Sequence, residues 1–370
     1  MRLASVPLED WLREYYFRVE HDLGSSGVEP YTLGEVRALA SIAEADLDRV
    51  LLEDSDTFGA AGLRAALAAR FGTAEDRVMV THGSSEAIYA TMRALLEAGD
   101  EAIAPSPGYP QLTTVAEACG ATVRRWIVPV EAGARPDLDA LEALVTPRTR
   151  AIVANFPHNP TGVALTGAER ERLIAIARRC GAHLVWDTAY AELDYEPSPG
   201  PDPMHAHERT IVFGTLSKAY GLPGLRVGWC IAAPETLRRM VGVRDHTTLY
   251  VSPLIEAIAE RVIRHGDAFV APRRECARAN RALVGAWVRD LGDLVAWRLP
   301  EGGVCAFPAL PRVADVTAFC RALAENQKVL LVPGACFERP RHVRLGFGCS
   351  TATLERGLER VTAALRRAAA

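Results

Sequence analysis

The segment Gly214-Thr215-Leu216-Ser217-Lys218-Ala219-Tyr220-Gly221-Leu222-Pro223-Gly224-Leu225-Arg226-Val227-Gly228-Trp229 decides how the rest of this chain is interpreted. Its lysine, Lys218, stands between a Thr-x-Ser pair and a glycine-rich turn, and Arg226 follows eight residues later. Burial and a neighbouring cation would lower the pKa of such a lysine and leave a neutral amine that can form a Schiff base with an aldehyde. Thr215, Ser217 and Arg226 are donors suited to a phosphate. The segment therefore predicts a cofactor with both an aldehyde and a phosphate, and pyridoxal 5′-phosphate (PLP) has both.

The bulk composition is typical of a soluble globular protein. The chain has 370 residues, 49% of them hydrophobic and 24% charged, which is enough to bury the cores of two domains. A net charge of −4 argues against a broad basic surface for nucleic acid, and no apolar run approaches the ~18 residues of a membrane span. The eight cysteines form no CxxC pair and do not stand at metal-ligand spacing from histidines. We therefore expect reduced thiols, no metal site and a cytoplasmic location.

Short apolar segments alternate with longer amphipathic ones between residues 64 and 243. Strands are predicted at residues 78–81, 101–104, 123–129, 150–155, 183–187, 210–213 and 227–231. Helices are predicted between them at residues 86–98, 111–119 and 166–180. Strands that alternate with helices indicate an α/β fold with a largely parallel sheet covered on both faces.

The remainder of the chain has a different pattern, which predicts a smaller α+β domain. Helices are expected at residues 253–291, 315–325 and 351–367, and strands at 304–308, 329–332 and 343–347. The expected organisation is an N-terminal segment (1–45) that packs with the small domain or with a partner subunit, a large cofactor-binding domain (46–250) and a C-terminal small domain (251–370).

Asp187 ends the apolar strand at 183–187, where a carboxylate is costly unless it is paired. A protonated pyridine nitrogen of PLP would pair it and keep the ring an electron sink. The alternative is a helix N-cap shared with Thr188, but Lys218 follows 31 residues downstream, and this favours the cofactor. Tyr190 is either a donor to the phenolic oxygen of PLP or an ordinary half-buried tyrosine.

Two turns supply further candidates. Asn155-Phe156-Pro157-His158-Asn159-Pro160-Thr161-Gly162 is a rigid turn after a buried strand, and Asn159 is its candidate donor to the phenolic oxygen. His82-Gly83-Ser84-Ser85-Glu86-Ala87 joins a strand to a helix, where main-chain N–H groups can reach a phosphate. Ser84 and Ser85 are the candidates there, and taken alone the motif would be a plain serine N-cap.

Tyr109 and Arg344 complete the set of candidates. Tyr109 lies in the stiff loop 105–110 after a strand, and it is either a ring that stacks on the pyridine or a packing residue. Arg344 lies on an apolar strand-like segment, where an arginine is costly unless it meets an anion. Bidentate capture of an α-carboxylate fits this position, and a structural salt bridge is the alternative.

These motifs together resemble those of fold-type I PLP enzymes of the aminotransferase class I and II group. The resemblance extends over nearly the whole chain and includes the Asn-Pro-x-Gly turn at 159–162 and the Arg-Leu-x-Phe string at 344–347. It implies a large domain with a mainly parallel seven-stranded sheet, a smaller α+β domain and PLP as cofactor. It also implies a homodimer with its active sites at the subunit interface and a small amino-acid substrate.

A narrower resemblance is to capreomycidine synthase and the arginine cyclases of streptolidine-type (streptothricin) pathways. It rests on residues 7–17, 25–28, 81–87, 155–160 and 217–230. It implies antibiotic biosynthesis and a β-hydroxylated arginine as substrate, with Gly27 and Arg344 in contact with that substrate. Whether the substrate is 3-hydroxy- or 3,4-dihydroxyarginine, its stereochemistry and the ring size of the product stay open.

The reaction that this resemblance implies begins when Lys218 removes the Cα proton. The β-hydroxyl is then eliminated as water, and the substrate's own guanidine adds at Cβ, helped by its tethering. The alternative is a PLP-dependent aminotransferase, and a regulator with a PLP fold is disfavoured because no helix-turn-helix extension is visible. Ordinary aminotransferases of this class often have a tyrosine in the region that is Asp54-Ser55-Asp56-Thr57-Phe58-Gly59 here, which puts simple amino transfer in doubt. Acidic side chains in that region or in the N-terminal segment are candidates to meet the guanidinium, and in the N-terminal segment these are Glu9, Asp10, Asp22 and Glu29.

Overall fold

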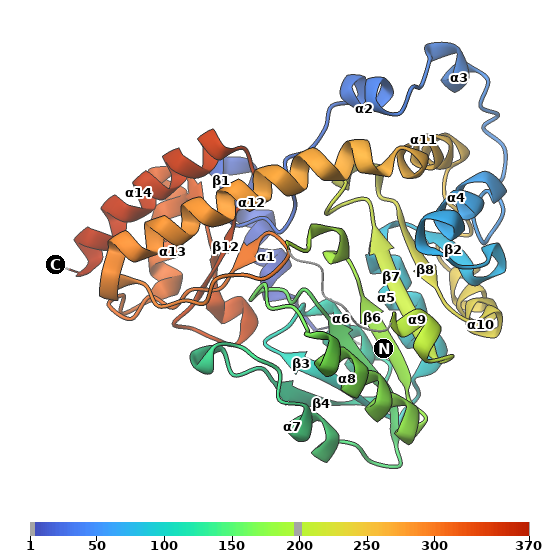
Figure 1. Ribbon diagram of the computed structural model, residues 1–370, viewed down its shortest axis with the longest axis horizontal. Helices are drawn as coiled ribbons and strands as arrows, with labels where there is room; N and C mark the ends of the chain where they lie inside the picture. Colours follow the sequence, from blue (N-terminus) through green and yellow to red (C-terminus); the bar gives the residue numbers. More distant parts are fainter. Residues whose placement is uncertain (1–3, 196–201, 370) are drawn as a thin grey trace.

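A seven-stranded sheet forms the centre of the larger part of the molecule (Figure 1). The structure is a computed structural model that describes residues 4–195 and 202–369. The strand order is β2-β8-β7-β6-β5-β3-β4, and β8 alone runs antiparallel to its neighbours. The strands are β2 (Val78–Thr81), β3 (Glu101–Ser106), β4 (Thr122–Ile127), β5 (Thr149–Asn155), β6 (His183–Asp187), β7 (Thr210–Thr215) and β8 (Gly228–Ile231). The expected mainly parallel seven-stranded sheet is confirmed.

Helices cover both faces of this sheet because side chains alternate between the faces along each central strand. On β5 and β6, Val153 and Val185 belong to one buried apolar cluster, while Ile152 and Leu184 belong to another. Helices α5 and α10 contribute to the first cluster, and α7 and α8 to the second. The helices of this part are α4 (Ala61–Phe71), α5 (Gly83–Leu95), α6 (Gln111–Ala118), α7 (Leu138–Ala143), α8 (Gly167–Cys180), α9 (Pro203–Ala206) and α10 (Pro234–Arg244).

A smaller α+β part is built on short strands and long helices. Its three-stranded antiparallel sheet has the order β11-β12-β9, and a separate parallel pair joins β1 to β10. These strands are β1 (His21–Asp22), β9 (Cys305–Ala306), β10 (Val329–Leu330), β11 (Val332–Pro333) and β12 (Val343–Gly346). The helices are α11 (Pro253–Arg264), α12 (Gly266–Leu291), α13 (Val316–Gln327) and α14 (Thr351–Ala369). Helix α12 runs from the larger to the smaller part (Figure 1).

Three predicted boundaries were wrong. The helix expected at 86–98 begins at Gly83, so the two predicted serines belong to its first turn. The helix expected at 253–291 is two helices, since α11 ends at Arg264 and α12 begins at Gly266. Because Gly266 has no side chain, the Arg70 guanidinium can approach the main chain there. The strand expected at 329–332 divides at Leu331 into β10 and β11, which belong to different sheets.

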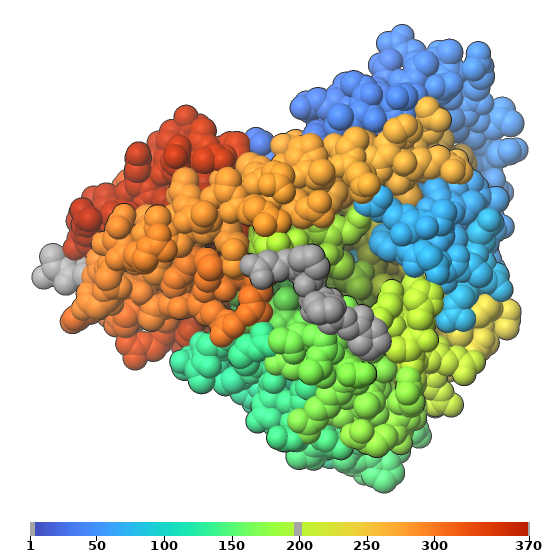
Figure 2. Space-filling model, viewed as in Figure 1, coloured from blue at the N-terminus to red at the C-terminus, as the bar shows by residue number. Residues whose placement is uncertain are grey.

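The N-terminal segment packs on the smaller part of its own chain. Helix α1 (Pro7–Tyr15) buries Leu8 and Trp11, and the Trp11 indole N–H donates to the carbonyl oxygen of Leu331 at 2.9 Å. Further along, α2 (Leu33–Leu39) and α3 (Glu44–Asp48) form an arm that projects at the top of the molecule (Figures 1 and 2). No helix in the ranges 4–195 and 202–369 has the length and apolar character to cross a membrane.

Candidate active site

The carboxyl ends of three neighbouring strands bring the predicted residues to one edge of the large sheet. β5 ends at Asn155, β6 at Asp187 and β7 at Thr215, with β6 between the other two. Open α/β sheets bind their ligands at this edge. The cavity found there is lined by Ser84, Tyr109, Asn155, Asn159, Asp187, Ala189, Tyr190 and Lys218. Six of these eight residues were predicted from the sequence.

Lys218 lies at the wall of this cavity, three residues after the end of β7. Its Nζ donates a hydrogen bond to the Ser26 hydroxyl oxygen at 2.8 Å. Burial, and after it the positive charge of Arg344, lowers the pKa of Lys218. A larger fraction of the amine is then neutral, which is the form that attacks an aldehyde.

Asp187 is a buried carboxylate that no cation neutralises within the described part of the chain. It is 4% exposed, and it accepts a hydrogen bond from the main-chain N–H of Ala189 at 2.9 Å. Burial raises the pKa of Asp187 to about 6. A buried acid with this deficit of positive charge fits the protonated pyridine nitrogen of PLP, which would restore its charged form.

The first turn of α5 and Arg226 together form a cradle for an anion. The N–H groups of Gly83, Ser84 and Ser85 open this helix and have no intrahelical acceptor. A Cβ atom added at Gly83 would lie 2.7 Å from a guanidinium nitrogen of Arg226, and one added at Gly228 would lie 2.6 Å from the nitrogen of Ser84. Only glycine at both positions leaves the cradle open for a phosphate.

Two hydroxyls stand beside the same guanidinium. The Thr215 hydroxyl lies 3.0 Å from that of Ser217, and Arg226 donates to the Ser217 hydroxyl at 3.4 Å. Arg226 itself is exposed and has a left-handed backbone with φ of 54°. The predicted phosphate residues are therefore close together, although they come from β7, the lysine loop and α5.

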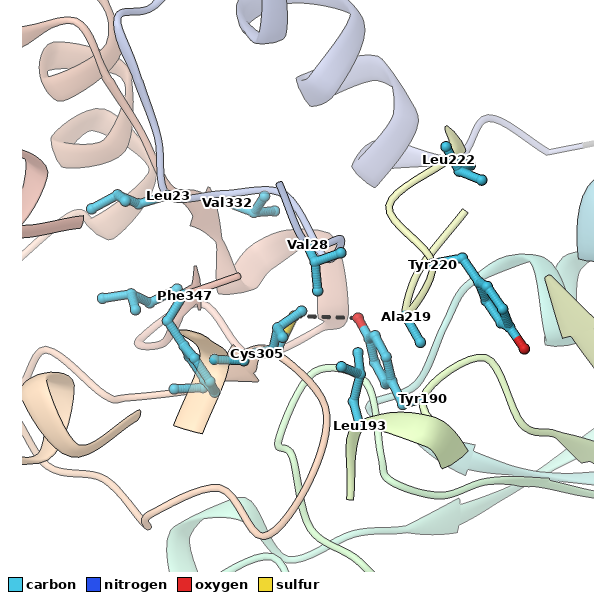
Figure 3. Packing of buried hydrophobic residues seen from close by; sticks show 14 of the residues in the cluster. Leu23, Val28, Tyr190, Leu193, Ala219, Tyr220, Leu222, Cys305, Val332 and Phe347 are labelled. Carbon is cyan, nitrogen blue, oxygen red and sulfur yellow. Dashed lines mark hydrogen bonds between the residues drawn. The ribbon is translucent and has the colours of Figure 1, made fainter. Parts of the chain in front are cut away.

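The two tyrosines of the site differ in their contacts. Burial is the main cause that raises the pKa of Tyr109, whose hydroxyl is also in contact with the Ser85 side chain. The Tyr190 hydroxyl donates to the main-chain oxygen of Ser26 at 2.9 Å and lies 3.4 Å from the sulfur of Cys305 (Figure 3). Tyr190 thus links the large sheet to the N-terminal segment and to β9, a link that the sequence did not predict.

Arg344 supplies a buried cation opposite Lys218. It is 1% exposed, and its hydrogen-bond acceptors within the described residues are neutral oxygen atoms. Its guanidinium donates to the carbonyl oxygen of Gly24 at 2.8 and 3.2 Å and to the side-chain oxygen of Asn159 at 3.4 Å. A buried guanidinium held by neutral acceptors is suited to bind a carboxylate.

Residues 21–31 form a strap across the site, and this feature was missed. Leu23 bonds to Leu330 through its N–H and to Gly346 through its carbonyl, and Tyr31 N–H donates to the oxygen of Gly221 in the lysine loop. Gly27 faces that loop, since a Cβ atom added there would lie 3.5 Å from the oxygen of Ser217. The sequence motif at 25–28 pointed to a function, but no local pattern could show that residue 26 meets Lys218.

The four N-terminal acids that were predicted as candidates differ in their contacts. Asp22 accepts from the N–H groups of Gly24 and Ser25, both at 2.9 Å, and so stabilises the strap. Two others form ion pairs, Asp10 with Arg13 and Glu29 with Arg273.

Glu9 differs from these three acids. Its carboxylate has no hydrogen bond or ion pair within residues 4–195 and 202–369, and its charge acts on both Tyr109 and Lys218. Helix α1 also borders the Tyr109 loop, since Ser5 and Pro7 line a hollow together with residues of the 105–110 loop. Glu9 is therefore the acid among the four that has no partner in the described part of the chain and whose charge acts on two residues of the cavity wall.

A buried lysine, an unpaired carboxylate at a strand end and a phosphate cradle define a PLP enzyme of the aminotransferase type. The family model described as aminotransferase class I and II matches residues 30–361, and the chain belongs to this family. The protein is a PLP-dependent enzyme that is similar to capreomycidine synthase. Capreomycidine synthase of Streptomyces vinaceus is 43% identical over 363 residues, which are 97% of this chain and 93% of that protein.

Other relatives include both a cyclase and an aminotransferase. The crystal structure of the PLP-dependent cyclase OrfR superposes with a TM-score of 0.93 at 42% identity, covering 99% of this chain and 98% of that one. The arginine–pyruvate transaminase of Pseudomonas aeruginosa is 33% identical over 341 residues, which are 87% of this chain and 85% of that protein. The protein is thus a capreomycidine synthase-like enzyme within a family that also contains transaminases.

Proposed function

We propose that this protein is a PLP-dependent cyclase that acts on a β-hydroxylated arginine, either 3-hydroxyarginine or 3,4-dihydroxyarginine. Its product is a cyclic arginine-derived amino acid for antibiotic biosynthesis. The observation that carries the proposal is that two opposite charges act on Lys218, namely that of the buried Arg344 and that of Glu9, whose carboxylate has no partner within the described residues. Such a site is complementary to an amino acid that has a carboxylate at one end and a guanidinium at the other.

We propose the following residues for holding the cofactor. Asp187 would meet the pyridine nitrogen, Asn159 and Tyr190 would serve the phenolic oxygen, and Tyr109 would stack on the ring. The first turn of α5 and the hydroxyl and guanidinium groups beside it would hold the phosphate, namely Ser84, Ser85, Thr215, Ser217 and Arg226. Bound PLP supplies an electron sink for carbanion chemistry at the substrate Cα.

The chain's own residues then have separate roles. Arg344, with Gly27 beside it, fixes the substrate carboxylate, and Glu9 fixes the guanidinium. Lys218 takes the Cα proton, and the hydroxyl at Cβ leaves as water. A guanidine nitrogen of the same molecule adds at Cβ, and Lys218 returns a proton to Cα. Binding at both ends holds the nucleophile near Cβ, which lowers the entropic cost of ring closure.

Aminotransfer is the second candidate, and a specific observation favours it. An arginine–pyruvate transaminase is among the relatives at 33% identity, and its named substrate also has both a carboxylate and a guanidinium. A site that binds both the carboxylate and the guanidinium of its substrate is therefore compatible with either cyclisation or amino transfer. The fate of the cofactor separates them, because a transaminase leaves its PLP in the amine form after the first half-reaction.

The proposed assembly is a homodimer with active sites at the interface. Leu51 and Leu52 are 70% and 79% exposed next to the projecting arm, and Leu249 is 51% exposed. Large apolar side chains that are exposed favour burial against a second copy. The dimer would also cover exposed apolar residues of the arm of α2 and α3, such as Leu33, which is 56% exposed.

The test is incubation of the PLP-loaded protein with 3-hydroxyarginine and, separately, with 3,4-dihydroxyarginine. The expected result is a product that has lost one water, with no keto acid and an unchanged cofactor spectrum. Lys218→Ala is the control, since it removes the base and leaves Arg344 and Glu9 in place. Keto acid release together with the spectrum of pyridoxamine phosphate would establish the transaminase instead.

A further inference from the structure

Ser26 is the nearest hydroxyl to the catalytic lysine. Its side-chain oxygen accepts from Lys218 Nζ at 2.8 Å, and the residue is 8% exposed. Its main-chain oxygen accepts from the buried Tyr190 hydroxyl at 2.9 Å. Ser26 is therefore fixed by hydrogen bonds to both its main chain and its side chain.

The strap that holds Ser26 beside Lys218 also contacts Arg344. Two residues earlier, the carbonyl oxygen of Gly24 binds the Arg344 guanidinium at 2.8 Å, and Val28 lies close to the Tyr190–Cys305 contact (Figure 3). A substrate whose carboxylate is on Arg344 and whose reacting carbon is at Lys218 lies along this part of the strap. The Ser26 hydroxyl, 2.8 Å from the Lys218 amine, would then stand beside the reacting carbon and its substituent.

We propose that Ser26 relays a proton from Lys218 to the departing β-hydroxyl. This inference rests on the proposed function. Lys218 removes the Cα proton and becomes an ammonium, the ammonium donates a proton to the Ser26 oxygen, and Ser26 gives its own proton to the leaving oxygen. The Cα–H pair of electrons forms the new Cα–Cβ double bond, the C–O pair leaves with the oxygen, and one water is released. The proton taken from Cα is the one that the water needs, so no other acid is required.

The chemistry requires such a donor, because hydroxide is a poor leaving group and general acid catalysis typically contributes about 10²- to 10⁴-fold. Other titratable groups are less suitable. Tyr190 already donates to Ser26, and burial is the main cause that raises its pKa, so it is a weak acid in this site. Glu9 faces the guanidinium end in the proposed orientation.

The test compares Ser26→Ala with Ser25→Ala, a neighbouring hydroxyl whose N–H rather than its side chain binds Asp22. Three substrates separate the steps: arginine in D2O reports Cα exchange, 3-hydroxyarginine reports loss of water, and 3-chloroarginine reports elimination of a group that needs no proton. For Ser26→Ala we expect exchange and chloride loss near the wild-type rates and water loss slower by about 10²- to 10⁴-fold. Ser25→Ala should behave as the wild type, and Ser26→Thr should regain part of the water loss.

A second readout does not depend on turnover. In the cofactor-free protein, Lys218 is labelled with an amine-reactive reagent, and mass spectrometry measures the labelling rate at a series of pH values. The dependence of this rate on pH gives the pKa of the Lys218 amine. Ser26→Ala should lower this pKa, since the ammonium loses an acceptor, and Ser25→Ala should not change it.

Each result supports or overturns the relay. Wild-type rates of water loss in Ser26→Ala would overturn the relay alone, and so would an equal decrease with the hydroxy and chloro substrates. A wild-type enzyme that releases no water from either hydroxyarginine would overturn the proposed function, and the relay with it.

Discussion

The guanidinium of Arg344 and the side-chain oxygen of Asn159 lie 3.4 Å apart at the boundary between the two parts of the molecule. The contact joins β12 of the small sheet to the turn that follows β5 of the large one. Because the Asn159 oxygen faces Arg344, its NH2 group is left for the cofactor side of the cavity. One asparagine can thus connect the carboxylate end of the substrate to the ring that activates it.

Arg344→Lys should weaken the use of the natural substrate without unfolding the protein. Lysine keeps the charge but loses the two-pronged contact with a carboxylate, so kcat/KM should fall by about 10- to 100-fold. Steady-state kinetics with 3-hydroxyarginine and with its α-amide provide the measurement. Relative to the wild type, the variant should lose kcat/KM with the carboxylate substrate, whereas kcat/KM with the amide should change little. An equal loss with both would mean that Arg344 has a structural role.

Glu9→Gln should reduce recognition of the guanidinium. The variant keeps the shape of the side chain and removes its charge, so discrimination between 3-hydroxyarginine and the uncharged 3-hydroxycitrulline should narrow by about tenfold. Spectral titration of the bound cofactor measures both affinities. Asp10→Asn is the matched control, because Asp10 is exposed and paired with Arg13. Unchanged discrimination in Glu9→Gln would assign the guanidinium to another residue.

Asp187→Asn should stabilise the cofactor-free protein at neutral pH. Burial raises the pKa of Asp187 to about 6 from 3.8, so the folded state holds a proton that the unfolded state releases. The free energy of unfolding should therefore fall as pH rises from 4 to about 6.5, by up to about 3 kcal/mol, and the variant should lose this decrease. Urea unfolding of both apoproteins across this range is the measurement. Parallel curves for the two proteins would contradict the prediction.

The same substitution should act in the opposite direction once PLP is present. The wild-type protein gains the interaction between Asp187 and the ring nitrogen, so PLP should raise its stability more than it raises that of Asp187→Asn. Thermal unfolding with and without the cofactor provides this comparison.

Substitution of the two exposed leucines beside the arm should produce a monomer. Leu51→Glu combined with Leu52→Glu places two charges on the surface proposed for the dimer, where burial of unpaired charge is costly. Light scattering after gel filtration gives the mass. Ile127→Glu is the control, since Ile127 is 52% exposed at the end of β4, on the side of the molecule away from the arm (Figure 1). A dimer that survives the double substitution would place the interface elsewhere.

Most of the large sheet could be predicted because its signals are local. Each central strand is a short apolar run that ends in a turn. Asp187 is the last residue of such a run, and Asn159 lies in the turn after another. The positions of the small-part strands were harder to predict, since β10 and β11 are two residues each and separate at Leu331. A separation of that kind depends on what each strand pairs with, since Val329 pairs with His21, near the other end of the chain, whereas Val332 pairs with Arg344.

The sequence by itself determined the family, the cofactor and the lysine, because these depend on side-chain chemistry at fixed spacing within single turns. It also suggested a few acids as candidate partners of a guanidinium. Only the tertiary structure shows which of the four N-terminal acids are paired, and only the tertiary structure brings Ser26 to Lys218, residues that are 192 positions apart. The reason is physical: the strap is held by hydrogen bonds to β10, β12 and the lysine loop, and such long-range main-chain contacts leave no periodic trace in the residues that they join.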